Sequence, residues 1–164
     1  MIVNKTFLIT GASSGLGEEF SLLIADIAKN IIITGRNKRR LLKLKKKINK
    51  INTAVNVVHI VTDLSTNLGV NQIFQKFEKQ DKIKFVDVLV NSAANFTVKK
   101  IENVSMDQIR KDFQINVISP FMLSKYFGLK MKKKIKVQYL ILGHLRLMIV
   151  LKIRQFIALQ SMLY

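Results

Sequence analysis

Short apolar runs alternate along the chain with segments whose apolar residues recur at helical spacing. The runs predict buried strands at residues 6–10, 30–34, 55–61 and 86–90. The helical spacing predicts helices that begin near residue 16 and that cover residues 38–50, 71–79 and 106–131. Pro120 falls near the middle of the last segment and predicts a kink or a junction there. Four strand–helix alternations indicate right-handed βαβ units, and therefore a Rossmann-like, doubly wound parallel sheet of the α/β class.

The same spacing predicts which helical side chains face the core. The predicted inward positions are Leu16, Phe20, Leu23, Ile24 and Ile27 in the first helix, Leu41, Leu42, Leu44 and Ile48 in the second, and Ile73, Phe74 and Phe77 in the third. After residue 131 the alternation stops, and residues 135–164 are apolar and basic without a clear period. We therefore expect one domain at residues 1–134, followed at residues 135–164 by an aberrant tail of uncertain structure.

Composition narrows the class of protein. With 49% hydrophobic and 23% charged residues, the chain should be globular rather than disordered. It has no Cys, which excludes disulfides and thiolate metal sites, and we predict no metal site. No signal peptide opens the chain, and its longest uninterrupted apolar run, residues 147–151, is far too short to span a membrane. These features predict a cytoplasmic protein without a membrane partner.

The formal net charge of +18 needs an explanation. A field that positive would attract nucleic acid or anionic lipid, so a basic binding module is one candidate function. The alternative is a coding bias that also enriches Ile and Asn. We favour this bias and expect no specific nucleic-acid partner, because the basic residues form no patch interleaved with aromatic residues. The charge is uneven, since Asp112 is the last acid and nine Lys or Arg residues follow it.

A glycine-rich loop lies between the first predicted strand and the first predicted helix. Gly11 allows a tight turn, Gly15 lets the backbone approach a pyrophosphate, and Gly17 lets the helix pack closely on the strand. The helix N-terminus, which begins near Leu16, offers N–H groups to phosphates, and the hydroxyls of Ser13 and Ser14 can add hydrogen bonds. The alternative is an ordinary Gly/Ser turn.

The end of the second predicted strand carries Arg36 and no acid. In dinucleotide-binding folds an acid at this place binds the ribose 2′-hydroxyl, whereas an Arg suits a 2′-phosphate. Arg36 could hold such a phosphate in a bidentate manner, so NADP is the expected cofactor and NAD the less favoured one. Residues 38–40, all basic, are expected to be a solvated helix start.

These motifs together resemble the short-chain dehydrogenase/reductase family. The loop spacing Gly-x3-Gly-x-Gly after Thr10 is similar to that of the family, and Gly35-Arg36 looks like its NADP-preferring members. The resemblance covers about residues 3–134, with five motifs in order. It identifies this stretch as an NAD(P)-binding Rossmann domain that is incomplete on its C-terminal side.

Three further motifs carry the resemblance. Asp63-Leu64 resembles the family pair whose Asp accepts a hydrogen bond from the adenine amine; the alternative is that Asp63 caps the next helix. Asn91 and Ala93 match the family's Asn-Asn-Ala-Gly, from which Ser92 and Ala94 depart. Asn116 matches the helix Asn of the family's catalytic tetrad, where it helps to hold a proton-relay water; the alternative is a satisfied core Asn.

The resemblance implies hydride transfer between a nicotinamide and a small carbonyl or alcohol substrate, in an enzyme that forms homo-oligomers. The family chemistry also needs a Ser and a Tyr-x-x-x-Lys pair. Tyr126 and Lys130 have this spacing, but they follow Asn116 by only ten residues and no catalytic Ser precedes them. We reject this pair, which leaves Asn116 as the remaining tetrad member.

A shifted reading frame would restore the missing residues. Loss of one base, or gain of two, near residues 131–134 lets the codons that overlap residues 156–161 encode Tyr-Ser-Ala-Ser-Lys, with a Ser codon twelve positions earlier. The alternative is a genuinely divergent tail. Under either reading, a catalytically inactive remnant that binds dinucleotide weakly is the second candidate function. We expect poor folding, because the fourth strand would leave an exposed apolar edge.

Overall fold

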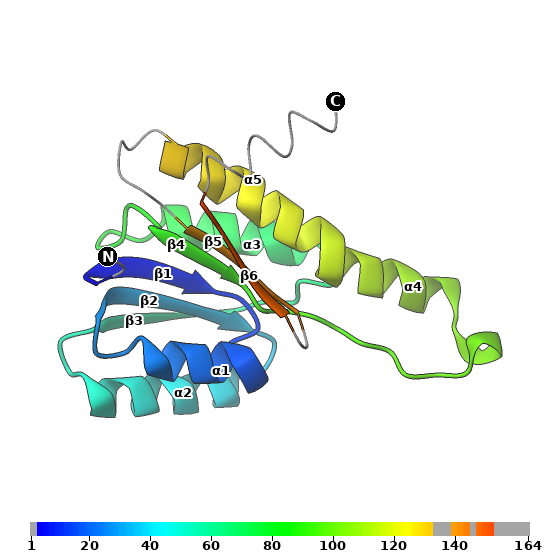
Figure 1. Cartoon of the computed structure of the whole chain (residues 1–164), viewed down its shortest axis with the longest axis horizontal. Helices are drawn as coiled ribbons and strands as arrows, with labels where there is room; N and C mark the ends of the chain where they lie inside the picture. The colour runs from blue at the N-terminus through cyan, green and yellow to red at the C-terminus, as the bar shows by residue number, and fades with distance from the viewer. Residues whose placement is uncertain (1–2, 133–138, 145–146, 153–164) are drawn as a thin grey trace.

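The computed structural model describes residues 3–132, 139–144 and 147–152, and it contains one six-stranded sheet (Figure 1). The strand order is β3-β2-β1-β4-β5-β6, in which β1 to β5 are parallel and β6 is antiparallel to β5. The strands are β1 (Lys5–Ile9), β2 (Ala28–Gly35), β3 (Asn56–Val61), β4 (Val88–Asn91), β5 (Tyr139–His144) and β6 (Leu147–Lys152). The predicted doubly wound α/β class is confirmed.

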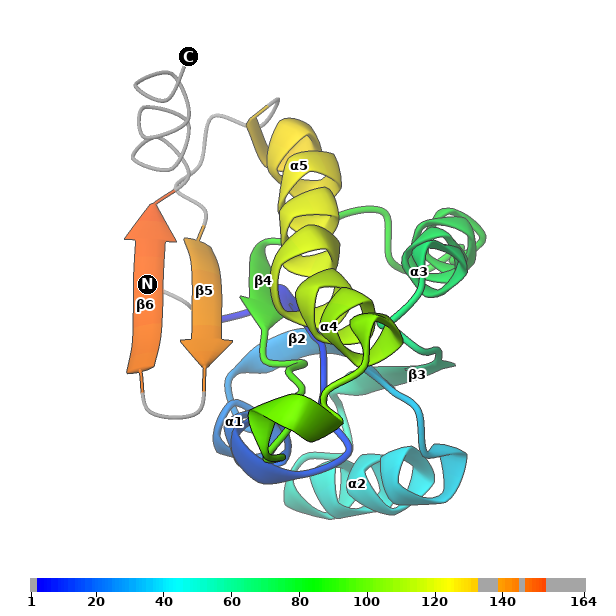
Figure 2. The same ribbon diagram turned by 90° about the vertical axis from the view of Figure 1, so that its right-hand side faces the viewer.

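Helices cover both faces of the sheet, as the two views show (Figures 1 and 2). The helices are α1 (Gly15–Leu23), α2 (Lys38–Ile51), α3 (Asn67–Glu78), α4 (Met106–Phe113) and α5 (Ser119–Lys132). One apolar core lies between the sheet and α1 and α2, and a second lies between the sheet and α3 and α5. Side chains alternate along a strand, so Ile31 and Ile33 enter the first core and Ile32 enters the second.

Three of the predicted inward positions are wrong. Leu16 and Leu23 of α1 are exposed, because this helix packs on the sheet through the small residues Gly17 and Ser21, which turns both leucines away from the core. Leu42 of α2 is exposed because it lies off the line of the buried side chains of that helix.

The long helical segment divides as Pro120 predicted. A π-helical turn, Gln114–Ile118, joins α4 to α5, and Pro120 is the second residue of α5. Pro lacks the N–H that would continue a regular helical ladder, so a junction at this place has a local cause. The junction brings Ile115 into the second core.

The expectation of an exposed β4 edge is wrong. β5 pairs with β4 in parallel from Val88↔Tyr139 to Asn91↔Leu142, and β6 then pairs with β5. Two of the apolar runs after residue 131 form strands, which is why they show no helical period. Residues 156–161, where the shifted frame would place Tyr-x-x-x-Lys, lie outside the described residues. In the described ranges, no helix has the length and apolar character needed to cross a membrane.

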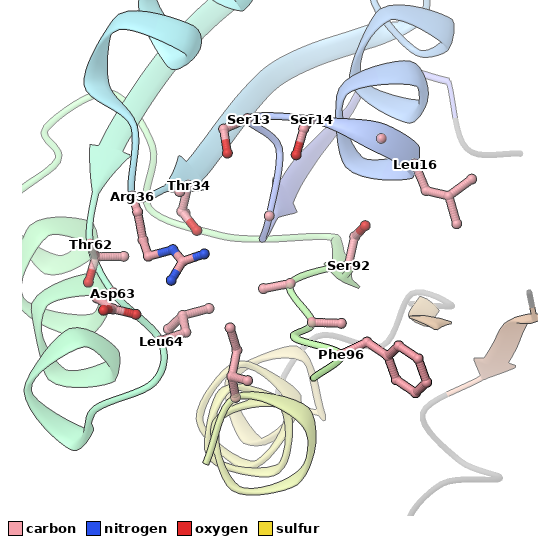
Figure 3. Close-up of a pocket in the computed structure, with 16 residues that line it drawn as sticks. Ser13, Ser14, Leu16, Thr34, Arg36, Thr62, Asp63, Leu64, Ser92 and Phe96 are labelled. Atoms are coloured by element: carbon pink, nitrogen blue, oxygen red, sulfur yellow. The ribbon is translucent and has the colours of Figure 1, made fainter. Parts of the chain in front are cut away.

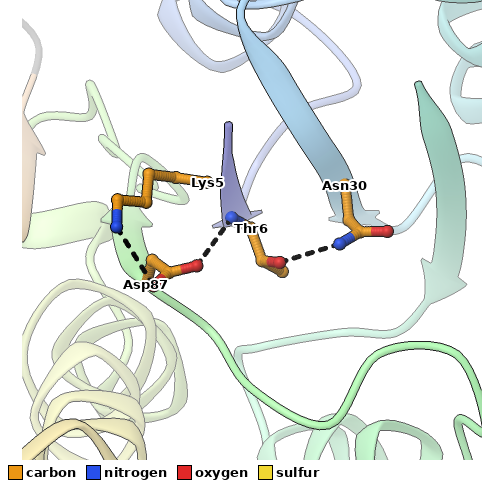
Figure 4. Close-up of polar contacts among 4 residues, drawn as sticks. All are labelled: Lys5, Thr6, Asn30 and Asp87. Carbon is orange, nitrogen blue, oxygen red and sulfur yellow. Dashed lines mark hydrogen bonds and ion pairs between the residues drawn. The ribbon is translucent and has the colours of Figure 1, made fainter. Parts of the chain in front are cut away.

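Polar side chains join the amino ends of four neighbouring strands, and Figure 4 shows those that join β4, β1 and β2. Asp87, directly before β4, accepts a hydrogen bond from the Thr6 N–H at 2.9 Å and lies 3.8 Å from the Lys5 ammonium. The Thr6 hydroxyl accepts from the Asn30 amide at 2.9 Å, and Asn30 in turn accepts from Asn56 at 3.2 Å. We call Asp87, Thr6, Asn30 and Asn56 the amino-end ladder. It runs across the sheet from β4 to β3.

Candidate functional site

A cavity of about 410 Å³ opens at the carboxyl ends of β1 to β4 (Figure 3). In open α/β sheets this is the edge at which ligands bind. Nine of the predicted site residues line it: Gly11, Ser13, Ser14, Gly15, Leu16, Arg36, Asp63, Leu64 and Ala93. Gly17, Asn91 and Asn116 belong to the same motifs but are not among its lining residues.

The glycine loop is shaped by two close backbone approaches. Gly11 has a φ of 64°, and a Cβ on it would lie 2.7 Å from the Cα and the N of Ala93. A Cβ on Gly17 would lie 2.6 Å from the Gly11 carbonyl oxygen, so α1 packs directly on the turn. Gly15 has a φ of 57°, and no heavy atom lies within 4 Å of the place that a Cβ would take, which leaves its backbone open toward the cavity side of the loop. Both glycines with positive φ therefore sit where a side chain would strain the loop.

Thr10, for which the sequence suggested no separate role, ties the two sides of the cavity together. Its hydroxyl oxygen accepts hydrogen bonds from the N–H groups of Ser92 and Ala93, each at 3.0 Å. The Thr10 N–H donates to the carbonyl of Val90 at 2.9 Å. The turn after β1 is thus fixed against the chain that leaves β4. A Thr directly before a glycine loop is the only sequence signal of this contact.

The N-terminus of α1 faces the loop without a side-chain cap. Ser14 is the N-cap residue, and its hydroxyl makes no capping hydrogen bond. N–H groups of a first helical turn that lack intrahelical partners can bind an anion, which the positive end of the helix dipole also favours. Glu18 is the acid of this turn, and it pairs with Lys47 of α2 at 2.8 Å, a contact that raises the pKa of Lys47.

Arg36 stands between two cavities. Its side chain is exposed and lines both the first cavity and a second of about 700 Å³. The second cavity is lined by Ser13, Ser14, Arg36, Asn37, Lys38, Arg39 and Arg40. The three basic residues after Asn37, expected to be only a solvated helix start, therefore face this cavity as well. They occupy the first turn of α2, which has no acid, and cations at a helix N-terminus are unfavourable unless an anion offsets them.

Asp63 and Leu64 line the cavity where the chain leaves β3. The Asp63 carboxylate accepts from the Ser65 N–H at 3.0 Å. The N-cap of α3 is Thr66, whose hydroxyl accepts from the Gly69 N–H at 3.0 Å. The alternative role of Asp63 as the cap of this helix is therefore wrong, and its carboxylate lies at the cavity instead.

The residues after β4 fit the wall of the cavity. Ser92, Ala93 and Ala94 line it, whereas Asn91 is buried and its amide donates to the Ser124 hydroxyl at 3.2 Å. Among the described non-glycine residues, Asn4 alone has a positive φ, so the methyl group of Ala94 causes no backbone strain. The departures from the family sequence at positions 92 and 94 are thus accommodated.

Asn116 lies in the π-helical turn and holds the loop that follows β4. Its side-chain oxygen accepts from the Asn95 N–H at 2.9 Å, and its amide donates to the Asn95 carbonyl at 2.8 Å. The Asn95 side chain in turn donates to Asp112 at 2.5 Å. Hydrogen bonds from Thr97 and Asn95 lower the pKa of Asp112. Asn116 is half-buried rather than part of the core, and both polar atoms of its side chain have partners in the loop, which they hold beside the cavity.

Tyr126 and Lys130 lie away from the cavity, between α5 and α3. The Tyr126 ring stacks on Phe74 with centroids 4.0 Å apart, and its hydroxyl donates to Glu78. Lys130 pairs with the same carboxylate at 2.6 Å. Burial, followed by the hydrogen bond to Glu78, raises the pKa of Tyr126, which is the opposite of what a proton-donating Tyr needs. This geometry supports the rejection of the pair as catalytic.

Several lining residues were not assigned from the sequence. Thr34, Gly35 and Thr62 lie beside predicted residues, so adjacency to a motif could have suggested them. Phe96 and Ile115 come from a loop and from the π-helical turn, and no spacing in the sequence signals that they reach the cavity. The ring of Phe96 is exposed at the rim, on the same side as Leu16 (Figure 3).

Comparison with known proteins identifies a family that this chain matches. The family model described as short chain dehydrogenase matches residues 5–138. An L-xylulose reductase of Caenorhabditis elegans is 30% identical over 122 residues, and an uncharacterised oxidoreductase of Bacillus subtilis, YvaG, is 25% identical over 123. These matches cover 74% and 75% of this chain, and 46% and 44% of the two relatives. The chain thus spans less than half the length of these relatives.

A solved structure shares the fold. The L-sorbose reductase from Gluconobacter frateurii, crystallised with NADPH and L-sorbose, superposes with a TM-score of 0.71 at 22% sequence identity. The match covers 80% of this chain and 49% of that protein. At this identity the likeness establishes the arrangement of the sheet and helices.

Proposed function

Because the chain belongs to the short-chain dehydrogenase family, we propose that its described residues form the NADP-binding half of an oxidoreductase. The reaction is hydride transfer between the nicotinamide and a small carbonyl or alcohol substrate. The observation that carries the proposal is the position of Arg36 between two cavities, with no acid at the end of β2 to bind an unphosphorylated ribose. The parent enzyme is proposed to act as a homo-oligomer.

The residues present fit a dinucleotide. The glycine loop and the uncapped start of α1 would hold the pyrophosphate, and Ser13 and Ser14 would add hydrogen bonds from the loop. Asp63 and Leu64 would hold the adenine at the other end of the cavity. Arg36 would hold the 2′-phosphate. The backbones of Gly11 and Ala93 approach so closely that no side chain fits between the turn after β1 and the chain after β4.

The bound cofactor would supply the hydride. This chain's own part in the chemistry is to orient the cofactor and to hold the loop after β4 through Asn116 and Asn95. We assign no proton transfer to Tyr126, whose hydroxyl is bonded to Glu78 outside the cavity.

The contact between Tyr126 and Glu78 also favours a second candidate function. A chain whose single Tyr-x-x-x-Lys pair is committed to the contact between α3 and α5 would bind dinucleotide without turning over substrate. Under this proposal the protein is a cofactor-binding remnant of the family.

Titration of the full chain with NADPH and NADH tests the cofactor. We expect NADPH to bind more tightly than NADH. The change Arg36→Leu should weaken the affinity for NADPH by about 10- to 100-fold and leave the affinity for NADH nearly unchanged, since a charge-assisted contact contributes about 1.5–3 kcal/mol. Lys43→Leu, a change of an exposed α2 cation that lines neither cavity, is the matched control. Equal binding of both cofactors by the wild type and the Arg36 variant would refute the NADP assignment.

Oxidation of NADPH in the presence of aldehydes and ketones separates the two candidates. No turnover is expected from the remnant. Turnover that disappears in Tyr126→Phe would show that this Tyr is catalytic after all, whereas turnover that survives the change would support the oxidoreductase without Tyr126.

A further inference from the structure

One buried hydroxyl beside the cavity has no hydrogen-bond partner. Thr34, the residue before the last of β2, is fully buried, and its hydroxyl oxygen is without a partner in the described part of the chain. Thr34 also lines the first cavity, and Figure 3 shows its hydroxyl directed toward the interior of that cavity, on the side of Arg36. Buried hydroxyls are nearly always hydrogen-bonded, so an isolated one in a binding cavity points to a ligand.

The other buried threonines make the contrast sharp. The Thr6 hydroxyl accepts from Asn30, that of Thr10 accepts from Ser92 and Ala93, and that of Thr62 donates to the Gly69 carbonyl at 2.8 Å. Each of these hydroxyls is satisfied within the protein. A Val would fill the place of Thr34 with the same branched shape and no polar atom, so packing alone does not account for the hydroxyl.

The position of Thr34 indicates which part of a ligand it meets. Side chains alternate along a strand, so Thr34 shares the face of Ile32, and Figure 3 shows Arg36, which follows the end of β2, beside it. This face carries Leu64 and Asp63 of the neighbouring β3 end, where the adenosine half of a dinucleotide lies in this class of fold. Thr34 is therefore placed beneath the adenosine rather than near the nicotinamide.

We propose that the Thr34 hydroxyl is a positioning group that hydrogen-bonds the adenosine ribose of the cofactor, independently of the 2′-phosphate. This inference rests on the proposed function. It assigns different tasks to neighbouring residues: Thr34 recognises the ribose that NADPH and NADH share, and Arg36 recognises the phosphate that only NADPH has. The hydroxyl reaches its partner only in the complex, so the free protein retains an unsatisfied polar group.

The test compares the stability of the free protein with its affinity for cofactor. Thr34→Val should raise the Tm of the free chain by about 3 °C, because it removes an unpaired buried hydroxyl. The same change should weaken the affinities for NADPH, NADH and 2′,5′-ADP alike, by about tenfold, as measured by calorimetric titration. Thr34→Ser keeps the hydroxyl and should stay within about twofold of the wild-type affinity.

Thr6→Val is the matched control, since its hydroxyl is buried and bonded at the other end of the sheet. It should lower the Tm and leave all three affinities unchanged. A purely structural Thr34 would behave like Thr6, and that result would overturn the proposal. A loss confined to NADPH and 2′,5′-ADP, with NADH unchanged, would also overturn it, because the contact would then be to the 2′-phosphate.

Failure of the proposed function gives a different result. If the wild-type chain binds none of the three ligands, the cofactor assignment itself is wrong and this inference falls with it. If the wild type binds them and Thr34→Val binds them equally well, the cofactor assignment stands and only the role of Thr34 is refuted.

Discussion

At the amino ends of β1 to β4, polar side chains are bonded to one another, whereas at the carboxyl ends polar groups face a cavity. Each member of the amino-end ladder hydrogen-bonds to a group on a neighbouring strand, and Figure 4 shows the bonds from Asp87 to Thr6 and from Asn30 to Thr6. At the opposite end Thr34 has no partner among the described residues, and Ser14 makes no capping hydrogen bond. The same sheet thus has one end that is complete within the protein and one end that is left for a ligand.

The helices reinforce this division. Since α3 and α5 run antiparallel to the strands, Glu78 and Lys130 near their C-terminal ends meet toward the amino side of the sheet (Figure 1). The starts of α1 and α2 lie at the carboxyl side, where their dipoles favour anions. These contacts between side chains therefore lie away from the edge that carries the cavity, and substitutions at the two ends should differ in kind.

The largest effect is expected at Gly11, which combines a close backbone approach with a positive φ at the cavity end of the sheet. Gly11→Ala should lower the free energy of unfolding by about 3 kcal/mol, because it combines a positive φ with a Cβ 2.7 Å from the Ala93 backbone. Urea denaturation measures the loss, and cofactor affinity should fall with it. Gly128→Ala is the control: nothing lies within 4 Å of its Cβ in α5, and the change should stabilise the chain by up to about 1 kcal/mol. Similar effects of the two substitutions would contradict the packing described for Gly11.

A smaller loss, of stability alone, is expected at the amino end. Asn30→Ala should reduce the free energy of unfolding by about 2 kcal/mol, because the buried Thr6 and the half-buried Asn56 both lose a hydrogen-bond partner. Cofactor affinity should not change. A drop in NADPH affinity without loss of stability would show that the two ends are not separate.

Gly15→Ala tests the site end without a steric clash. Its φ is 57°, but no atom lies within 4 Å of the added methyl group, so only the conformational cost of about 1 kcal/mol applies. The loss of NADPH affinity should exceed what this destabilisation explains, because the methyl group would stand where the phosphate approaches. Unchanged affinity in a binding titration would remove Gly15 from the phosphate site.

The smallest effect is expected from the exposed ion pair of α3 and α5. Glu78→Gln should cost about 0.5 kcal/mol, because the carboxylate is more than half exposed and solvent screens it. Lys130, followed by Tyr126, lowers the pKa of Glu78 below its ordinary 4.5, so the carboxylate stabilises the fold above that pH. The difference between wild type and variant in urea denaturation should therefore be constant near neutral pH and shrink as the pH falls below about 4.5. A difference that grows in acid would refute the pairing.

Much of the first 132 residues could be predicted from local patterns. The alternation of apolar runs and amphipathic segments predicts the order of strands and helices, and glycine spacing predicts the turn between β1 and α1, because both depend on neighbours in the chain. The exposure of Leu16 and Leu23 could not be predicted, since α1 packs on the sheet through Gly17 and Ser21 and both leucines face away from the core. Phe96 reaches the cavity through tertiary contacts that no spacing encodes.

The strand pairing after residue 131 shows a different limit. The segment 139–144 has no helical period, yet it pairs with β4 as a strand, so the absence of a helical period was a poor guide to its structure. The sequence also could not predict that the Thr34 hydroxyl lacks a hydrogen-bond partner. Its significance depends on which groups surround it, and Thr6 is the same residue type with a partner.

The contact between the turn after β1 and the chain after β4 has a consequence for synthesis. Thr10 and Gly11 leave the ribosome some eighty residues before the N–H groups of Ser92 and Ala93 that hold them. A nascent chain can form β1, β2 and β3 in the meantime, but the side of the cavity that the chain after β4 provides is still missing. The second wall of the cavity therefore forms only when the fourth strand docks beside the first.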